Sequence, residues 1–426
     1  MKILQILEES PSLDFTLPIF EFTDDNCEIL VFSTKPSFQH WYDVNPTNLM
    51  FNNTNIKFLT CIDSLKIGSR LKQYLHGNTK INRSNDKNIL SKISRKFFNF
   101  VINTLCKPDE FIEDYFKGNP DIVFIETRND LIPNRINKKL FQWINKNNIK
   151  TVGVPNSAYT LENVKWSPIE PFGVHKITSP PFNSFPKNFE YWMTSKQPFV
   201  IEQLGNVPYK IVGYPGVDTK WLELFKYKSN KEKRLDEINI LINVRHFGQK
   251  RNLGYGTGQY VLEDIEEFFV TIRDLINSIK DVNFNLFIKP HYYVNFSEFE
   301  KILNNLNIKN YKFVKTSIYK ALLNMDIVIG LHTSVNLVSA LAGYPTILYP
   351  QVLSNNIKKD DTKTNLMYEG MMGYSENIEE FKLIFKKLLI DDTRSYFSKK
   401  DSDFLRKFFK DDSIRHLSPY INLNLN

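Results

Sequence analysis

Three groups of residues with the chemistry of an anion-binding site occur in the second half of the 426-residue sequence, each at the end of a short apolar run. The runs are INILINV (238–244), FNLFIKP (284–290) and DIVIGL (326–331). The residues that end or follow them supply cations, imidazoles and hydroxyls: Arg245 and Lys250, then Lys289 and His291, then His332, Thr333 and Ser334. A helical pattern starts at Ser334, and a helix N-terminus adds free N–H groups and a positive dipole end. Together the three groups predict a phosphate or diphosphate site, provided that the fold brings them together.

The elements that must position these groups form an alternating series. Strands are predicted at 238–244, 284–290, 311–316, 326–331 and 346–350, and helices between them at 262–280, 297–306, 317–325 and 334–343. Alternation with short connections predicts a doubly wound parallel sheet, in which ligands lie beyond the carboxyl ends of the strands. Two more helices are predicted at about 377–390 and 393–410.

A second series of apolar runs fills the first half, before the charged linker 226–237. The runs lie at 2–7, 27–33, 56–61, 121–127, 150–155, 191–195 and 209–214. Several are apolar throughout, as in strands that are buried on both faces of a parallel sheet. We therefore expect an α/β protein of two Rossmann-like domains, 1–225 and 226–380, that face each other across a cleft. The C-terminal helices within 381–426 are expected to pack back toward that cleft.

Positive charge is concentrated in one segment. Residues 64–107 contain ten Lys or Arg and one acid, Asp86, a net charge of +9 within a chain of net +8. The stretch ILSKISRKFFNFVINTL (89–105) has the spacing of an amphipathic helix with a basic face. Such a helix suits peripheral contact with an anionic membrane or an anionic acceptor, and the alternative is a solvated surface helix. No nucleic-acid motif accompanies the segment, so we expect no nucleic-acid partner.

The cysteines and the N-terminal sequence bear on the compartment. Three cysteines, Cys27, Cys61 and Cys106, are too few and too scattered for a disulfide scaffold or a Cys-based metal cluster. Residues 1–20 do not have the pattern of a signal peptide, and no run reaches the roughly 20 apolar residues of a membrane span. We expect a cytoplasmic protein, with peripheral contact at the inner face of the membrane.

The second-half motifs resemble a known family. VGYPGVD (212–218), KPH (289–291) and SIYKALLNMDIVIGLHTSVNLVSALAGYPTILY (317–349) are similar to the second domain of GT-B glycosyltransferases. The similarity is greatest to the branch with HP and SS/ST motifs, which includes bacterial sialyltransferases, capsule Kdo transferases and CDP-glycerol polymerases. Non-hydrolysing UDP-GlcNAc epimerases share the same plan. The resemblance covers about 140 residues of the second domain and only the general layout of the first.

The resemblance implies roles for several residues. His291 matches the histidine of the HP motif, and Thr333 and Ser334 match the SS/ST pair, all of which contact the donor phosphate in the family. Two positions depart from the pattern: Tyr292 replaces the proline, and Ser339 stands where many UDP-sugar transferases carry a ribose-binding glutamate. The second departure favours a CMP or CDP donor over UDP or GDP.

An inverting enzyme of this family also needs a general base from its first domain, within hydrogen-bond reach of the acceptor hydroxyl. Glu8 and Glu9 follow the run 2–7, and paired carboxylates raise the pKa of one partner. Glu126 lies in the run 121–127 and is an equal candidate. Solvated loop acids are the alternative reading for all three. Polar residues that follow the run 150–155 are candidates for lining the acceptor site: Asn156, Ser157 and Tyr159.

These inferences predict a metal-independent enzyme without a resident cofactor, because neither an Asp-x-Asp motif between apolar strand residues nor histidines at metal-ligand spacing occur. The favoured reaction is transfer of a CMP-activated ulosonic acid, of sialic-acid or Kdo type, to a bacterial surface glycan or a lipid-linked acceptor in capsule or lipopolysaccharide synthesis. The alternatives are a CDP-glycerol glycerophosphotransferase, a UDP-sugar transferase or epimerase on the same fold, and a non-catalytic GT-B scaffold that binds glycan or membrane.

Overall fold

A computed structural model describes most of the chain. The described residues are 1–7, 13–34, 50–53, 55–81, 100, 102, 104–126, 135–154, 186–194, 201, 204–227, 237–244, 247–248, 260–290, 296–314, 316–331, 334–350, 370–408 and 413–424. They divide into two compact units. The first contains the described residues of Met1–Glu162, Val174–Asp218 and Asp411–Asn426, and the second those of Thr219–Lys410.

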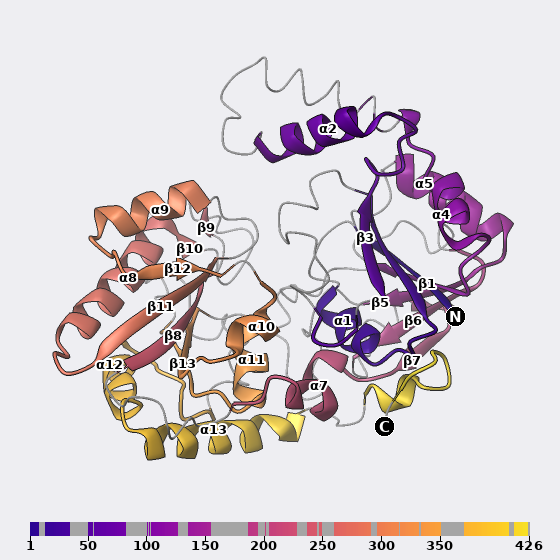
Figure 1. Ribbon diagram of the computed structural model, residues 1–426. Helices are drawn as coiled ribbons and strands as arrows, with labels where there is room; N and C mark the ends of the chain where they lie inside the picture. The colour runs from indigo at the N-terminus through magenta and orange to yellow at the C-terminus, as the bar shows by residue number, and fades with distance from the viewer. Residues whose placement is uncertain are drawn as a thin grey trace. The chain divides into compact units, whose positions relative to one another are not determined.

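The first unit is built on a parallel sheet, coloured indigo to magenta in Figure 1. Its strands are β1 (Lys2–Leu7), β2 (Glu28–Ser33), β3 (Ile56–Thr60), β4 (Ile122–Glu126), β5 (Lys150–Val154), β6 (Phe189–Met193) and β7 (Tyr209–Ile211). Within the described residues their spatial order is β3-β2-β1-β4-β5-β6-β7. This is the order of the Rossmann fold with one strand added at the edge, and the order reverses between β1 and β4.

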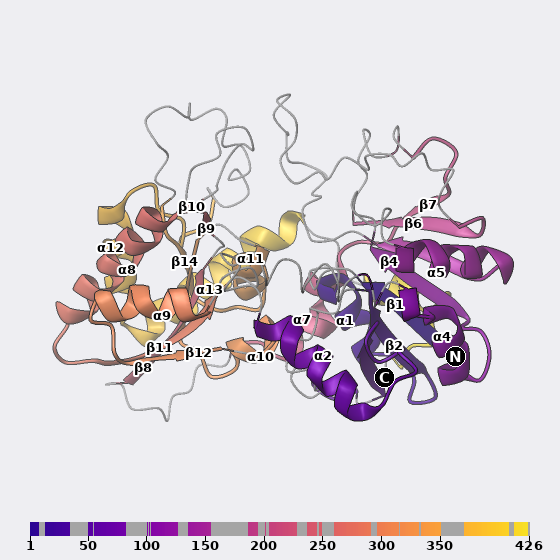
Figure 2. The ribbon, with the colours of Figure 1, turned by 90° about the horizontal axis from the view of Figure 1, so that it is seen from above.

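Helices cover both faces of this sheet. Figure 2 shows α1 (Leu13–Glu21) on one side of β1, and α4 (Pro108–Phe116) and α5 (Arg135–Lys146) on the other. Leu4 and Ile6 belong to a core cluster that includes Ile112 of α4 and Leu140 of α5. On the opposite face, the ring of Phe124 packs against Phe20 and Trp192 at centroid distances of 6.0 and 5.5 Å. The strands are buried on both faces, which explains their continuously apolar sequences.

The second unit repeats the plan with a smaller parallel sheet. Its strands are β8 (Glu237–Val244), β11 (Asn283–Pro290), β12 (Tyr311–Phe313), β13 (Ile327–Gly330) and β14 (Thr346–Leu348), in the order β12-β11-β8-β13-β14. Counted along this unit, the order is again 3-2-1-4-5, with the reversal between β8 and β13. Two short strands, β9 (Phe247–Gly248) and β10 (Tyr260–Val261), pair separately. The predicted α/β class and the two parallel sheets are confirmed.

Two sets of helices sandwich the second sheet. Apolar residues of α8 (Leu262–Asn277), α9 (Phe296–Asn305) and α12 (Ile378–Lys387) share one core cluster with alternate residues of β8. In Figure 1 these helices lie on one side of the sheet, and α10 (Ile318–Leu322) and α11 (Ser334–Leu341) lie on the other. As predicted, Ser317 caps α10, its hydroxyl accepting a bond from the N–H of Lys320 at 3.3 Å. Further along the chain comes α13 (Asp391–Leu405).

The boundaries of the units differ from the expected 1–225, 226–380 and 381–426. The chain passes to the second unit at Thr219, because α7 (Thr219–Glu223) places Trp221 against Tyr319, with ring centroids 4.7 Å apart. Helices α12 and α13 belong to the second unit. The segment after them returns to the first unit, where the N–H of Ile414 donates to a carboxylate oxygen of Asp218 at 2.9 Å.

No helix among the described residues combines the length and apolar character that crossing a bilayer requires. Cys27, Cys61 and Cys106 are buried and carry free thiols.

Candidate functional site

The three motif-bearing strands of the second unit are neighbours. Strands β11, β8 and β13 lie side by side, with Pro290 in register with Val244 and Gly330 in register with Asn243. Each of the three predicted anion-binding groups begins at the carboxyl end of one of these strands. The reversal of strand order between β8 and β13 is the point at which open α/β sheets bind ligands. The expectation that the fold brings these strand ends together is therefore confirmed.

Most of the predicted donor-site side chains lie outside the described residues: Arg245, Lys250, His291, His332 and Thr333. Ser334 is the first residue of α11, so the backbone forms the predicted helix N-terminus at this point. The three candidate acceptor-site residues Asn156, Ser157 and Tyr159 also lie outside the described part, as do Glu8 and Glu9. Their roles remain predictions.

Among the cationic residues predicted at the carboxyl ends of β11, β8 and β13, Lys289 is the one whose side chain the structure describes. Its side chain is half-buried, and its ammonium group donates to the carbonyl oxygen of Thr316 at 2.8 Å. Lys289 is in register with Asn243, and registered residues of parallel strands point to the same face of the sheet. The lysine charge is therefore held on the same face as Asn243, one residue before the end of β11.

Asn243 is a buried polar residue that the sequence analysis missed. Its side chain is 3% exposed, and neither its amide nitrogen nor its amide oxygen has a hydrogen-bond partner in the described part of the chain. A buried amide without partners is destabilising by roughly 1–3 kcal/mol per unsatisfied group. Such groups are rare in native interiors and mark functional positions or bound water.

Asn336, in the first turn of α11, is a second missed amide. It is fully buried, and its side-chain nitrogen donates to the carbonyl oxygen of Leu331 at 2.7 Å. Its side-chain oxygen has no partner among the described residues. The amide occupies the space next to Gly330, where an added β-carbon would lie 2.0 Å from that oxygen. Asn336 thus fixes the backbone at Leu331, directly after the end of β13.

Ser339, the position at which the resemblance implies a ribose-binding glutamate in UDP-sugar transferases, is fully buried. Its hydroxyl donates to the carbonyl oxygen of Val335 at 2.8 Å within α11. The hydroxyl proton is therefore engaged inside the helix, and the residue presents no carboxylate for a ribose.

The first sheet has a comparable edge. Strands β1, β4 and β5 are neighbours, and Glu126, the last residue of β4, is in register with Val154 at the end of β5. Glu126 therefore stands at the reversal point of the first sheet, beside the strand that Glu8 and Glu9 follow. The side chain of Glu126 lies outside the described part of the structure.

Gln5 gives this edge a buried amide too. It lies on β1, is in register with Phe124 of β4, and is fully buried. Neither polar atom of its side chain has a partner within the described residues. Each unit thus carries an unsatisfied amide on the first strand of its sheet, beside the reversal point. The signal in the sequence was an amide inside a mostly apolar run: Gln5 in KILQIL, and Asn243, together with Asn239, in INILINV.

Among the described side chains, no three His, Cys, Asp or Glu residues are grouped as the ligands of a metal ion would be.

Comparisons with known proteins give a distant resemblance in structure alone. No protein-family model and no curated protein matches the chain. UDP-GlcNAc 2-epimerase from Neisseria meningitidis, solved bound to UDP-GlcNAc, is similar with a TM-score of 0.46 and 12% identity over 95% of this chain and 96% of that one. The spinosyn rhamnosyltransferase SpnG has a TM-score of 0.42 and 11% identity over 98% of this chain and 99% of its own.

The wall teichoic acid polymerase TagF has a TM-score of 0.44 and 11% identity over 98% of this chain and 87% of that one. Similarities of this size are too distant to support an argument about family or reaction. The α/β architecture follows from the two sheets themselves.

Proposed function

We propose that this chain is a nucleotide-sugar-dependent glycosyltransferase of the GT-B plan, which binds the donor at the carboxyl ends of β11, β8 and β13. The observation that carries the proposal is the convergence of three motif-bearing strand ends on the reversal point of one parallel sheet.

The chemistry of this edge suits a diphosphate or phosphodiester. The Lys289 ammonium and the N-terminus of α11 are both cationic in character, and the motif residues His291, Thr333 and Ser334 add further hydrogen-bond donors in the sequence. In a transferase these groups stabilise the negative charge that develops on the leaving nucleotide. The enzyme would then need no metal ion for this step.

The donor that we favour is a CMP-activated ulosonic acid, because the family resemblance places His291 and the Thr333-Ser334 pair on one phosphate and because Ser339 replaces the ribose-binding glutamate. A CDP-glycerol or UDP-sugar substrate would use the same phosphate site. The general base is proposed to come from the first unit, with Glu126, Glu9 and Glu8 as the candidates and a surface glycan or lipid-linked hydroxyl as the acceptor.

A thermal-shift titration of the full chain with CMP, CDP, UDP and GDP, with and without Mg²⁺, tests the proposal. A ligand that binds only the folded state stabilises it by RT ln(1+[L]/Kd), so the preferred nucleotide gives the largest shift. The expected result is a CMP shift that does not depend on Mg²⁺. The largest shift with UDP would contradict the CMP donor, and no shift with any of the four would contradict the nucleotide site.

A pair of histidine variants locates the site. His291→Ala should weaken the preferred nucleotide at least about tenfold, the loss of one hydrogen bond to a charged group. His416→Ala removes an exposed histidine of the first unit and should leave the affinity unchanged. Equal affinities in the two variants would show that the nucleotide lies elsewhere.

A further inference from the structure

Residues 383–400 expose large apolar side chains and lysines together. This stretch contains the second half of α12, the turn after it and the first part of α13, and the structure describes all of it. Leu383, Ile390 and Tyr396 are 55%, 62% and 54% exposed. The other exposed residues of the stretch are mostly lysines: Lys386, Lys387, Asp392, Ser395, Lys399 and Lys400. We call residues 383–400 the α12–α13 surface.

The helices that carry this surface are anchored by their opposite faces. Ile384, Phe385 and Leu388 of α12 and its end belong to the core cluster of the second unit, and Phe397 of α13 belongs to it too. Helix residues spaced by three, four and seven positions share one face, so the exposed residues from Leu383 to Ile390 form one outward stripe. The inner face holds the helix on the core, and the outer apolar groups are left in water.

One spacing of an apolar residue and two lysines occurs on both helices. Lys386 and Lys387 follow Leu383 by three and four positions, and Lys399 and Lys400 follow Tyr396 by the same intervals. Residues at these intervals are neighbours on a helix surface. The Lys400 ammonium accordingly lies 5.7 Å from the centroid of the Tyr396 ring. Each of the two exposed apolar side chains is therefore flanked by cations.

Most of the positive charge of the α12–α13 surface is not neutralised by ion pairs. The stretch contains five Lys or Arg and two acids, a net charge of 5 − 2 = +3. One ion pair lies inside it, between Arg394 and Asp391 at 2.9 Å. Within the described part of the chain, no carboxylate pairs with any of its four lysines. These four ammonium groups are therefore available to an external anionic surface.

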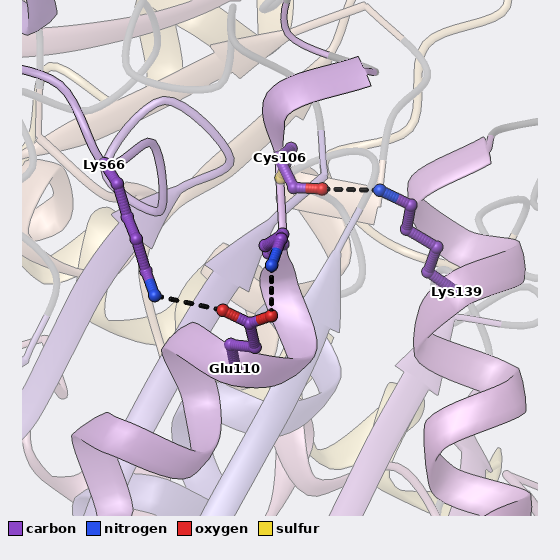
Figure 3. Close-up of polar contacts among 5 residues, drawn as sticks. Lys66, Cys106, Glu110 and Lys139 are labelled. Atoms are coloured by element: carbon purple, nitrogen blue, oxygen red, sulfur yellow. Dashed lines mark hydrogen bonds and ion pairs between the residues drawn. The ribbon is translucent and has the colours of Figure 1, made fainter.

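The basic segment 64–107 differs in this respect. The structure describes four of its Lys or Arg side chains, and three of them bond to groups of the first unit: Lys66, Lys72 and Lys107. In Figure 3, Lys66 reaches the carboxylate of Glu110 on α4, and Lys139 of α5 donates to the carbonyl oxygen of Cys106 at 2.7 Å. Most of the described cations of that segment therefore hold its own fold together.

We propose that the α12–α13 surface docks this protein on a membrane that contains anionic phospholipids. Lysines are attracted to the headgroups, and the apolar side chains between them enter the boundary between headgroups and acyl chains. The long lysine stems let the ammonium groups stay in the headgroup layer while the apolar groups insert.

Other partners fit this surface less well. A soluble polyanion, such as an acidic polysaccharide, would satisfy the lysines but would leave Leu383, Ile390 and Tyr396 in water. An apolar groove on another protein would bury these three side chains, but it would also take the interleaved ammonium groups out of water at a large cost. A lipid surface satisfies both kinds of side chain at once, and this is the observation that favours it.

Cosedimentation of the full chain with vesicles tests the inference. We expect binding to vesicles of phosphatidylcholine mixed with phosphatidylglycerol and much weaker binding to phosphatidylcholine alone. Leu383→Ser with Tyr396→Ser should bind the anionic vesicles at least about tenfold more weakly, because the two side chains together lose more than the roughly 1.4 kcal/mol of a tenfold change. Lys386→Gln with Lys387→Gln should weaken this binding at least about fivefold, because a lysine near an anionic surface contributes roughly 1 kcal/mol.

A matched control uses α2 (Ser69–Ile81) in the first unit. Leu71→Ser with Tyr74→Ser removes side chains that are 49% and 58% exposed and should bind as the parent does. All the substituted side chains are exposed or lie on an outer helix face, so the midpoint of thermal unfolding should stay near that of the parent and show that each variant is folded.

Four outcomes would overturn the proposal. Two are no vesicle binding and equal binding to both vesicle types. The third is anionic binding that Leu383→Ser with Tyr396→Ser leaves unchanged, which would mean that charge alone is recognised, as on a soluble polyanion. The fourth is an equal loss in the α2 control, which would assign the contact to the segment 64–107. The thermal shift with nucleotide should be the same in all variants, so failure of membrane docking and failure of the proposed transferase activity are separate results.

Discussion

The contact between Gly330 and Asn336 leads to a quantitative prediction. A methyl group at Gly330 would lie 2.0 Å from the side-chain oxygen of Asn336 and 2.6 Å from its amide carbon and nitrogen. Ordinary contact begins at 3.4 Å, so the amide must move by about 1.4 Å. Asn336 is fully buried and holds Leu331 by a hydrogen bond of 2.7 Å, so a shift of that size breaks the bond.

The expected destabilisation of Gly330→Ala is about 3 kcal/mol. Overpacking a well-packed interior costs roughly 1–3 kcal/mol, and a buried carbonyl that loses its partner costs roughly 1–3 kcal/mol more. The free energy of unfolding can be measured by urea denaturation, and hydrogen exchange over residues 327–341 locates the change. Gly68→Ala is the control, because nothing lies within 4 Å of the added carbon there, and it should be neutral or slightly stabilising.

A double-mutant cycle tests the cause. Asn336→Ala alone loses the bond to Leu331 and leaves a small cavity, about 2 kcal/mol in all. Because it also removes the atoms that a methyl at Gly330 would strike, the double variant should be about as stable as Asn336→Ala alone. Additive effects of the two substitutions, or a Gly330→Ala variant as stable as the parent, would refute the steric argument.

Three other predictions concern buried or partly buried side chains. Burial raises the pKa of Asp401 to about 6 from 3.8. The native state therefore binds this proton more tightly than the unfolded state, and the free energy of unfolding falls by up to about 3 kcal/mol as pH rises from about 4 to about 6. In denaturation curves measured over this pH range, Asp401→Asn should remove that fall. If the pH dependence is unchanged in the variant, Asp401 is not its source. Asn243→Leu removes an unsatisfied amide, so it should raise the free energy of unfolding by about 1 kcal/mol and weaken nucleotide binding. A variant that is less stable than the parent, or that binds the nucleotide normally, would argue against a functional role of this amide. The ring of Tyr420 packs on Trp192 at a centroid distance of 5.7 Å, and its centroid lies 3.7 Å from the Lys210 ammonium. Tyr420→Ala should therefore lower the midpoint of thermal unfolding by an amount equivalent to about 1–3 kcal/mol. An unchanged midpoint would show that the contacts of Tyr420 do not stabilise the first unit.

The sequence was sufficient for the strands of the two large sheets, because parallel strands buried on both faces leave continuous apolar runs, but it did not predict the short pair β9 and β10. Its errors are at element ends, where backbone geometry decides. The run 209–214 predicts a longer strand than β7. The N–H of Val212 still donates to the carbonyl of Met193 on β6, but Gly213 takes a φ of +81°, which ends the extended backbone. A pattern of apolar residues does not show this change of backbone conformation.

The sequence predicted some features of the candidate site and not others, again because some of them depend on the folded structure. Strand ends could be predicted to carry the motifs, because loops that follow parallel strands are rich in functional side chains. The buried amides were missed because hydrogen-bond satisfaction is a property of the folded interior. Nothing in the sequence tells whether Asn243 meets a partner, or that Asn336 stands against Gly330.

The return of the chain to the first unit has a consequence for biosynthesis. Leu423 bridges to Thr23, and the N–H of Asn424 donates to the carbonyl of Phe22 at 2.7 Å. A ribosome adds about 5–20 residues per second, so the second unit, residues 219–410, emerges before this closing segment does. The second unit has all of its own parts at that time, whereas the first still exposes the surface that residues 413–424 later cover. During synthesis from the N-terminus, the second unit is therefore complete first. The first unit, although it contains the N-terminal half of the chain, is completed last.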